Sequence, residues 1–184
     1  MNRVILICGA KRSGKDVVAD YLVEQYGYTK VKVATPLKRV VQDLFGFTDD
    51  QLETNEKDQV DIRWGVSPRR VMQFLGTDIM QYKIQELIPD IGRTFWIKSL
   101  IKQMLSSNTP TVVSDIRFRH ECDMLKSVFK NVHIIRVVRN ATRSPSDDHI
   151  SEQEFNTIEV DAIIDNDNTI DHLHEQIDKF MMDK

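Results

Sequence analysis

The sequence predicts an α/β fold in three layers, with a parallel five-stranded sheet covered by helices on both faces. Short apolar or alternating runs, typical of strands, take turns along the chain with segments whose apolar residues recur at helical spacing. A glycine-rich turn joins the first apolar run to the first helical segment. Hydrophobic residues make up 41% of the 184 positions, which is enough for the core of a single domain over 1–184.

The first strand, 4–8, runs directly into Gly-Ala-Lys-Arg-Ser-Gly-Lys-Asp at 9–16, and a helix follows. This order of strand, glycine-rich turn and helix is typical of a phosphate-binding loop, and residues 9–16 are named the phosphate loop below. Gly9 and Gly14 let the backbone wrap around an anion, and the helix start adds partial positive charge. We expect the backbone of this loop, Ser13 included, to hold the phosphates of ATP and Lys15 to reach the outer ones.

Asp16 departs from the usual pattern, in which a Ser or Thr hydroxyl follows the lysine and binds magnesium. A carboxylate there can hold Mg²⁺ directly or through water, since this ion takes oxygen ligands and keeps several waters. The alternative is a chance turn with Asp16 as a helix cap, and the joint register of strand, glycines, lysine and helix speaks against it. Lys11 and Arg12 either contact ATP or simply face solvent, and their spacing does not decide between these interpretations.

The middle of the chain predicts one strand and then several helices. Gly27 ends the first helix, and Pro36 and Pro68 suit the first turns of two later ones. The expected elements are a strand at 30–34, a helix from 35 to near 46, a loop or short helical piece over 47–66, a helix that starts at 68 with Ser67 as its cap, and a helix over 95–105.

The last third of the chain alternates strands and helices again. The expected elements are a strand at 111–115, a helix over 119–129, a strand at 132–138, a polar loop from 139 to about 157, a short strand at 162–164 and a helix over 170–180. In parallel sheets, ligands bind at the carboxyl ends of the strands. That rule places residues 9–15, 35–38, 115–117 and 139–143 on one rim.

Two carboxyl-end segments supply further candidates for catalysis. Asp115 could order magnesium-bound water or contact the acceptor, although it could equally cap a helix or pair with Arg117. Arg117 suits a bidentate contact with a phosphate. Arg139 and Arg143 lie in the polar loop, which as a lid would close over ATP and neutralise charge on the transferred phosphoryl group; a disordered polar loop is the alternative.

A helical turn near residue 70 suits an acceptor site. Arg69 and Arg70 offer cations for a phosphate, and Gln73 offers an amide for a base edge. Lys38, one turn into its own helix, is a further candidate. An ordinary solvated helix face remains the alternative for all of these residues.

Composition excludes several classes of protein. The net charge of −3 argues against a surface devoted to nucleic acid, and no apolar run is long enough to span a membrane. Cys8 and Cys122 lack zinc-site spacing and are expected to be buried, reduced thiols. The N-terminus reads as a core strand and not as a signal peptide, so we expect the cytoplasm, that of the host if the protein is viral. The sequence leaves open whether the chain forms a homodimer.

Four stretches, in the same order, resemble the bacteriophage deoxynucleoside monophosphate kinases. They are the phosphate loop with its unusual aspartate, the block Arg-Arg-x-Met-Gln-x-Leu-Gly-Thr-Asp within 67–78, Val113–Arg117, and Val137–Arg139 with Asp148–Glu152. The resemblance implies a P-loop kinase fold with a helical acceptor-binding region, 35–105, and a lid, 139–157. It also implies Mg²⁺-dependent phosphorylation of deoxynucleoside monophosphates by ATP.

By this resemblance, Arg70 and Gln73 fall in the acceptor region, and Arg139 and Arg143 fall in or beside the lid. The chain looks shorter than the phage enzymes between Gly46 and Ser67. Animal phosphomevalonate kinases have a similar loop and a stretch like Ile-Arg-Trp-Gly at 62–65, so a small-molecule kinase of that type is the second hypothesis. A nucleotide-binding regulatory module is the third, although pure binding does not need the arginines of the lid and acceptor sites.

Overall fold

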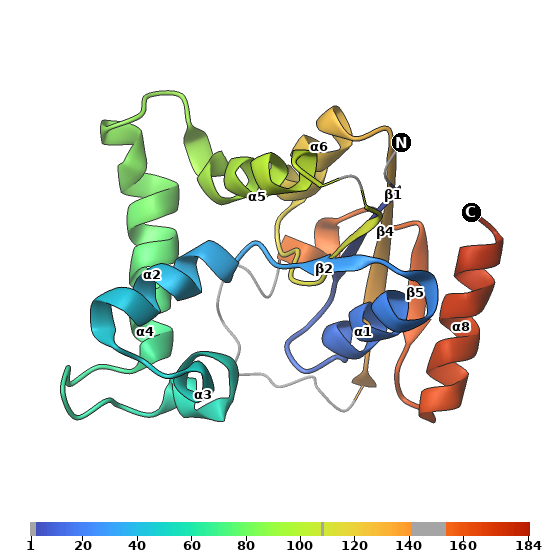
Figure 1. Cartoon of the computed structure of the whole chain (residues 1–184), viewed down its shortest axis with the longest axis horizontal. Coiled ribbons are helices and arrows are strands. Elements are labelled where there is room, and N and C mark those ends of the chain that lie inside the picture. The colour runs from blue at the N-terminus through green and yellow to red at the C-terminus, as the bar shows by residue number, and fades with distance from the viewer. Residues whose placement is uncertain (1–2, 108, 141–153) are drawn as a thin grey trace. The chain divides into compact units, whose positions relative to one another are not determined.

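The computed structural model describes residues 3–107, 109–140 and 154–184 (Figure 1). The chain divides into two compact units, Met1–Val33 with Leu100–Lys184, and Ala34–Ser99. The first unit holds the sheet and the second is helical. The interpretation of 35–105 as an acceptor-binding region and of 139–157 as a lid stays a prediction, and residues 141–153 of that lid lie outside the described residues.

The sheet has five parallel strands in the order β2-β3-β1-β4-β5, which confirms the predicted α/β class. The strands are β1 (Arg3–Cys8), β2 (Thr29–Val31), β3 (Thr111–Val113), β4 (Asn131–Val138) and β5 (Ala162–Asp165). In the register of the central strands, Leu6 pairs with Val113 and Cys8 with Arg136. β2 and β3 are shorter than the sequence predicted.

Helices cover both faces of the sheet, and β1 is therefore buried on both sides. Ile5 and Ile7 pack in one core with residues of α1 (Lys15–Tyr26) and α8 (Ile170–Met182), which lie side by side (Figure 1). Side chains alternate along a strand, so the equally buried Val4 and Leu6 face the opposite layer. In the same unit, α6 (Arg119–Val128) buries Cys122 and Leu125. Both cysteines are buried and unbridged, as predicted.

The helical unit is built from short helices around a small core of Val41, Phe47, Leu52 and Val71. Its α-helices are α2 (Thr35–Phe45), α3 (Asp49–Glu53), α4 (Pro68–Gln73), which continues as a π-helical segment over Phe74–Tyr82, and the start of α5 (Phe95–Leu105).

The local signals in this unit act as predicted. Pro36 lies in the first turn of α2, and Gly46 ends that helix in the left-handed conformation, with φ 63°. The Ser67 hydroxyl accepts a hydrogen bond from the Arg70 amide at 3.3 Å and so caps α4. Across the described residues, no helix combines the length and apolar character that a membrane crossing requires.

Candidate active site

Three neighbouring strands bring predicted site residues to one edge of the sheet. β3, β1 and β4 are adjacent and parallel, so the residues that follow their carboxyl ends share a rim. Gly9 follows β1, Ser114 and Asp115 follow β3, and Arg139 follows β4. Residues 35–38 belong to the other unit, and Arg143 lies outside the described residues.

The phosphate loop is wound so tightly that its two glycines are required. Gly9 has φ 146°, and an added Cβ would lie 2.3 Å from the Val137 carbonyl oxygen. Gly14 has φ 98°, and its added Cβ would lie 2.2 Å from Nδ2 of Asn166. Side chains are excluded at both positions by backbone conformation and by lack of space. Ser13 is fully buried inside the turn, and its amide donates to the Ala10 carbonyl at 3.2 Å.

The Lys15 side chain folds over the loop from the first residue of α1. Its Nζ donates hydrogen bonds to the carbonyl oxygens of Gly9 at 2.8 Å and Ala10 at 2.6 Å. The ammonium therefore lies above the turn at which the helix start presents its partial positive charge. Of the two cations inside the loop, Arg12 is exposed and has a left-handed backbone, with φ 64°, while Lys11 is half-buried.

Asp16 is held by two lysines from the neighbouring strand segment. Lys30 Nζ lies 2.8 Å and Lys32 Nζ 2.9 Å from Oδ1 of Asp16. Partial burial opposes ionisation of this carboxyl, but the hydrogen bonds and charges of the two lysines outweigh it and lower the pKa of Asp16 to about 2. Asp16 is thus a carboxylate at any physiological pH.

Asp115 holds the chain segment that follows β2. Its Oδ1 accepts a hydrogen bond of 2.7 Å from the Val33 amide. At the start of α6, Glu121 Oε2 accepts hydrogen bonds from the amides of Arg117 at 2.9 Å and Phe118 at 3.1 Å. Burial raises the pKa of Glu121 to about 7 despite those two bonds. The Arg117 side chain is exposed.

Carboxylate and hydroxyl oxygens, the ligand type that magnesium takes, lie at this rim. Asp16, Ser114 and Asp115 lie at or beside the ends of β1 and β3, and the Ser114 hydroxyl donates to Asp16 Oδ1 at 3.3 Å. Within the described ranges no three His, Cys, Asp or Glu residues gather into a preformed metal site. Magnesium needs none, because it binds through one or two carboxylates, substrate phosphates and water.

Two features of this site do not follow from local sequence patterns. Alternation gives Lys30 and Lys32 only as polar positions of a strand, and does not predict their contacts with Asp16. Asn166 follows β5, and its Nδ2 donates to the Ser13 carbonyl at 2.9 Å. The rule that ligand sites gather at carboxyl ends of strands could have singled out Asn166.

In the helical unit, the structure separates the cations that the sequence grouped together. Arg69 forms an ion pair with Asp58, and Lys38 Nζ lies 2.5 Å from Oε2 of Glu53. Arg70 is exposed, and its guanidinium forms no ion pair with any residue of the described ranges. Gln73, half-buried, lies three residues further along α4. Arg70 is thus the better placed of the two arginines to bind an anion.

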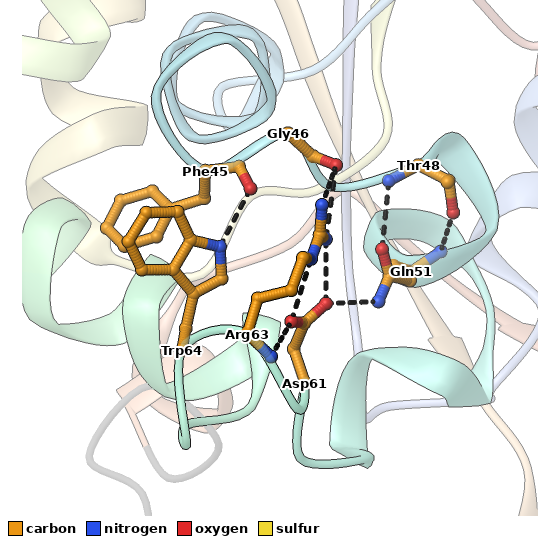
Figure 2. A network of polar contacts seen from close by, with 7 residues as sticks. All are labelled: Phe45, Gly46, Thr48, Gln51, Asp61, Arg63 and Trp64. Atoms are coloured by element: carbon orange, nitrogen blue, oxygen red, sulfur yellow. Dashed lines mark hydrogen bonds and ion pairs between the residues drawn. The ribbon is translucent and has the colours of Figure 1, made fainter.

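A polar network holds the turn that precedes α4 (Figure 2). Asp61 accepts hydrogen bonds from Gln51 Nε2 at 2.9 Å and from the amide, Nε and Nη2 of Arg63 at 2.9, 3.0 and 2.8 Å. Arg63 also donates to the Gly46 carbonyl at 3.2 Å, and Trp64 Nε1 donates to the Phe45 carbonyl at 2.8 Å. The Ile-Arg-Trp-Gly stretch therefore anchors the end of α2, α3 and this turn to one another.

Part of the Arg-Arg-x-Met-Gln-x-Leu-Gly-Thr-Asp block is explained by packing. An added Cβ at Gly76 would lie 2.5 Å from Cδ2 of Leu37, so glycine lets α2 approach this segment closely. Trp96 Nε1 donates to the Gly76 carbonyl at 2.8 Å. Packing accounts for Gly76, whereas it does not account for Arg70 and Gln73.

Comparison with known proteins connects this chain to one family. The profile of the family described as deoxynucleotide monophosphate kinase matches residues 3–63 and 42–177. The deoxynucleotide monophosphate kinase of Enterobacteria phage T4 is 23% identical over 245 aligned positions, which cover 95% of this chain and 97% of the phage enzyme. An Acanthamoeba polyphaga mimivirus protein that carries the same family name is 30% identical over 185 positions, covering 95% of this chain and 93% of that protein.

Solved structures support the fold. TT1252 from Thermus thermophilus superposes with a TM-score of 0.53 at 14% identity, over 99% of this chain and 97% of its own. A sugar kinase from Janibacter sp. HTCC2649 superposes with a TM-score of 0.50 at 12% identity, over 99% of this chain and 95% of its own. Together with the strand order and the loop after β1, these similarities identify the P-loop kinase fold.

Proposed function

Because this chain belongs to the deoxynucleotide monophosphate kinase family, a family of phosphotransferases, we propose that it transfers the γ-phosphoryl group of ATP to deoxynucleoside monophosphates. The observation that carries the proposal is the meeting of the phosphate loop with Asp115 and Arg139 at adjacent strand ends. A nucleoside triphosphate bound by that loop would present its outer phosphate to this rim.

In the proposed reaction, a phosphate oxygen of the acceptor attacks the γ-phosphorus in line with the bond that breaks. The β–γ bridging oxygen leaves with ADP, and the product is a deoxynucleoside diphosphate. Such transfers depend mainly on positioning and on stabilisation of charge. Lys15 and Arg139 would neutralise charge on the phosphoryl group. Arg117 would bind a phosphate, and Asp115 would order magnesium-bound water or contact the acceptor.

Magnesium, when bound with ATP, supplies positive charge that neutralises the β- and γ-phosphates. Asp16, Ser114 and Asp115 would hold it, directly or through water. The low pKa of Asp16 keeps that carboxylate ionised for this role.

On the acceptor side, Arg70 would bind the monophosphate, and Gln73 would contact the base edge. Lys38 is a weaker candidate for the acceptor site because Glu53 already neutralises it. The Ile-Arg-Trp-Gly stretch has a structural explanation in the network around Asp61, so its similarity to phosphomevalonate kinases does not by itself point to that substrate.

The direct test is ADP release from ATP and Mg²⁺ with a panel of acceptors: the deoxynucleoside monophosphates, their ribose counterparts and phosphomevalonate. We expect turnover with one or more deoxynucleotides, and the panel then also gives the base preference. Turnover with phosphomevalonate alone would move the protein to the second hypothesis. Tight ATP binding without turnover of any acceptor would favour a regulatory module.

A further inference from the structure

The aspartate after the phosphate-loop lysine creates an electrostatic problem for an anionic ligand. Asp16 lies in the first turn of α1, where other loops of this kind carry a neutral hydroxyl. Its side chain is 58% exposed, and it lies next to Lys15 at the start of the helix that follows the phosphate loop. The negative charge of Asp16 would repel a triphosphate bound by the loop, and the repulsion grows as water is displaced from the site.

Lys30 in β2 and Lys32, which follows that strand, form ion pairs with Asp16. Both ammonium groups contact the same oxygen of Asp16, and Lys30 also lies 2.8 Å from Oδ1 of Asp20, one turn further along α1. The two lysines are 22% and 27% exposed, which is low for lysine, so their stems are packed and their positions defined. Two positive charges thus balance the two carboxylates on this side of the helix.

We propose that Lys30 and Lys32 are positioning residues for nucleotide binding, which neutralise Asp16 so that the phosphate loop can accept a polyphosphate. The proposal rests on the proposed ATP site and goes beyond it, since neither lysine needs to contact ATP. The Lys15 ammonium binds the carbonyls of Gly9 and Ala10 on the loop itself, whereas Lys30 and Lys32 contact Asp16 directly. Lys32 is the better residue to substitute, because Lys30 also forms an ion pair with Asp20.

The test is equilibrium binding of ATP and ADP by calorimetry in EDTA, so that no metal ion masks the charge of Asp16. Lys32→Met keeps the length of the side chain and removes its charge. We expect the Kd for ATP to rise by about tenfold or more, and that for ADP to rise less because ADP carries less charge. Lys126→Met, on the exposed face of α6, removes the same charge elsewhere and should leave both constants unchanged.

A second substitution separates neutralisation from direct contact. Asp16→Asn in the Lys32→Met background removes the charge that Lys32 balances, and it should restore ATP affinity in EDTA. Asp16→Asn alone should tighten metal-free ATP binding, because the repulsion disappears while both lysines remain. This variant keeps the proposal testable if Lys32→Met fails to fold.

Unchanged ATP affinity in Lys32→Met would overturn the proposal. A loss of ATP affinity that Asp16→Asn does not restore would also overturn it, since Lys32 would then act on the phosphates or on β2. Weaker metal-free ATP binding in Asp16→Asn alone would overturn it as well. A wild-type protein that does not bind ATP would instead remove the proposed function. The two failures are therefore distinguishable.

Discussion

Nδ2 of Asn166 donates a hydrogen bond of 2.9 Å to the Ser13 carbonyl and joins the end of β5 to the phosphate loop across 153 positions of sequence. The Asn166 amide in turn donates to the Val138 carbonyl at 2.9 Å. The same side chain fills the space beside Gly14 in which a Cβ would lie. The conformation of the loop is therefore set partly by the last strand of the sheet.

Asn166→Ala should loosen the phosphate loop while the backbone contact to Val138 remains. One hydrogen bond contributes about 1 kcal/mol, so we expect a small loss of stability in urea and a severalfold rise in the Kd for ATP. The matched control is Asn168→Ala, an exposed asparagine two residues along the same loop. If both variants bind ATP like the wild type, Asn166 does not shape the site.

Lys15→Ala should abolish most phosphoryl transfer without unfolding the protein. The side chain is half-buried at the surface of the loop, and two of its hydrogen bonds go to backbone carbonyls of the loop. Turnover should fall by about a hundredfold or more, as for other preorganised charges that stabilise a transition state. Steady-state kinetics measures the loss, and circular dichroism tests the fold.

Lys179→Ala, on the exposed face of α8, serves as the control for Lys15→Ala and should retain normal kinetics. Near-normal turnover in Lys15→Ala would rule out the phosphate-loop assignment. Lost turnover with an unfolded spectrum would show instead that the Gly9 and Ala10 contacts are needed for folding.

Adjacent arginines on α4 provide a matched pair for the acceptor site. Arg70→Ala should raise the KM for the deoxynucleoside monophosphate by about tenfold or more, the effect expected from losing a charged contact with phosphate, and leave the KM for ATP unchanged. Arg69→Ala removes the ion pair with Asp58, a surface pair worth at most about 1 kcal/mol, and should change neither constant. A larger effect on ATP than on the acceptor would move Arg70 out of the acceptor site.

Sequence signals that act within one turn of chain predicted the local structure well. The phosphate loop, the glycines that end α1 and α2, and the serine cap of α4 all depend on backbone conformations that a few residues specify. The position of Gly9, Asp115 and Arg139 after the carboxyl ends of neighbouring strands followed from parallel topology, which the alternation of strands and helices implied.

Contacts between distant segments could not be read from the same signals. Alternation in 30–34 shows that Lys30 and Lys32 share a side of the strand, but it does not show that this side faces α1. Glu121 has the sequence context of an ordinary surface residue in a helix, and it is 5% exposed because the backbone before α6 turns two amides toward it. Partners and burial of this kind depend on tertiary packing.

Glu121 should make the protein less stable as the pH rises through neutrality. Its pKa is raised from 4.5 to about 7 in the folded protein, mainly by burial. Between these values the native state holds a proton that the unfolded chain has released, so stability falls as the pH rises from about 4.5 and levels off above 7. The total effect of this single group is at most about 3 kcal/mol.

Glu121→Gln removes the titration and keeps a side-chain oxygen to accept from the amides of Arg117 and Phe118. Urea unfolding of wild type and variant at pH 5.5 and pH 8 measures the difference. We expect the wild type to lose more stability than the variant between the two pH values, whatever the absolute stability of the variant. Equal losses would mean that Glu121 ionises normally in the fold, because its two backbone hydrogen bonds then offset the cost of burying its charge.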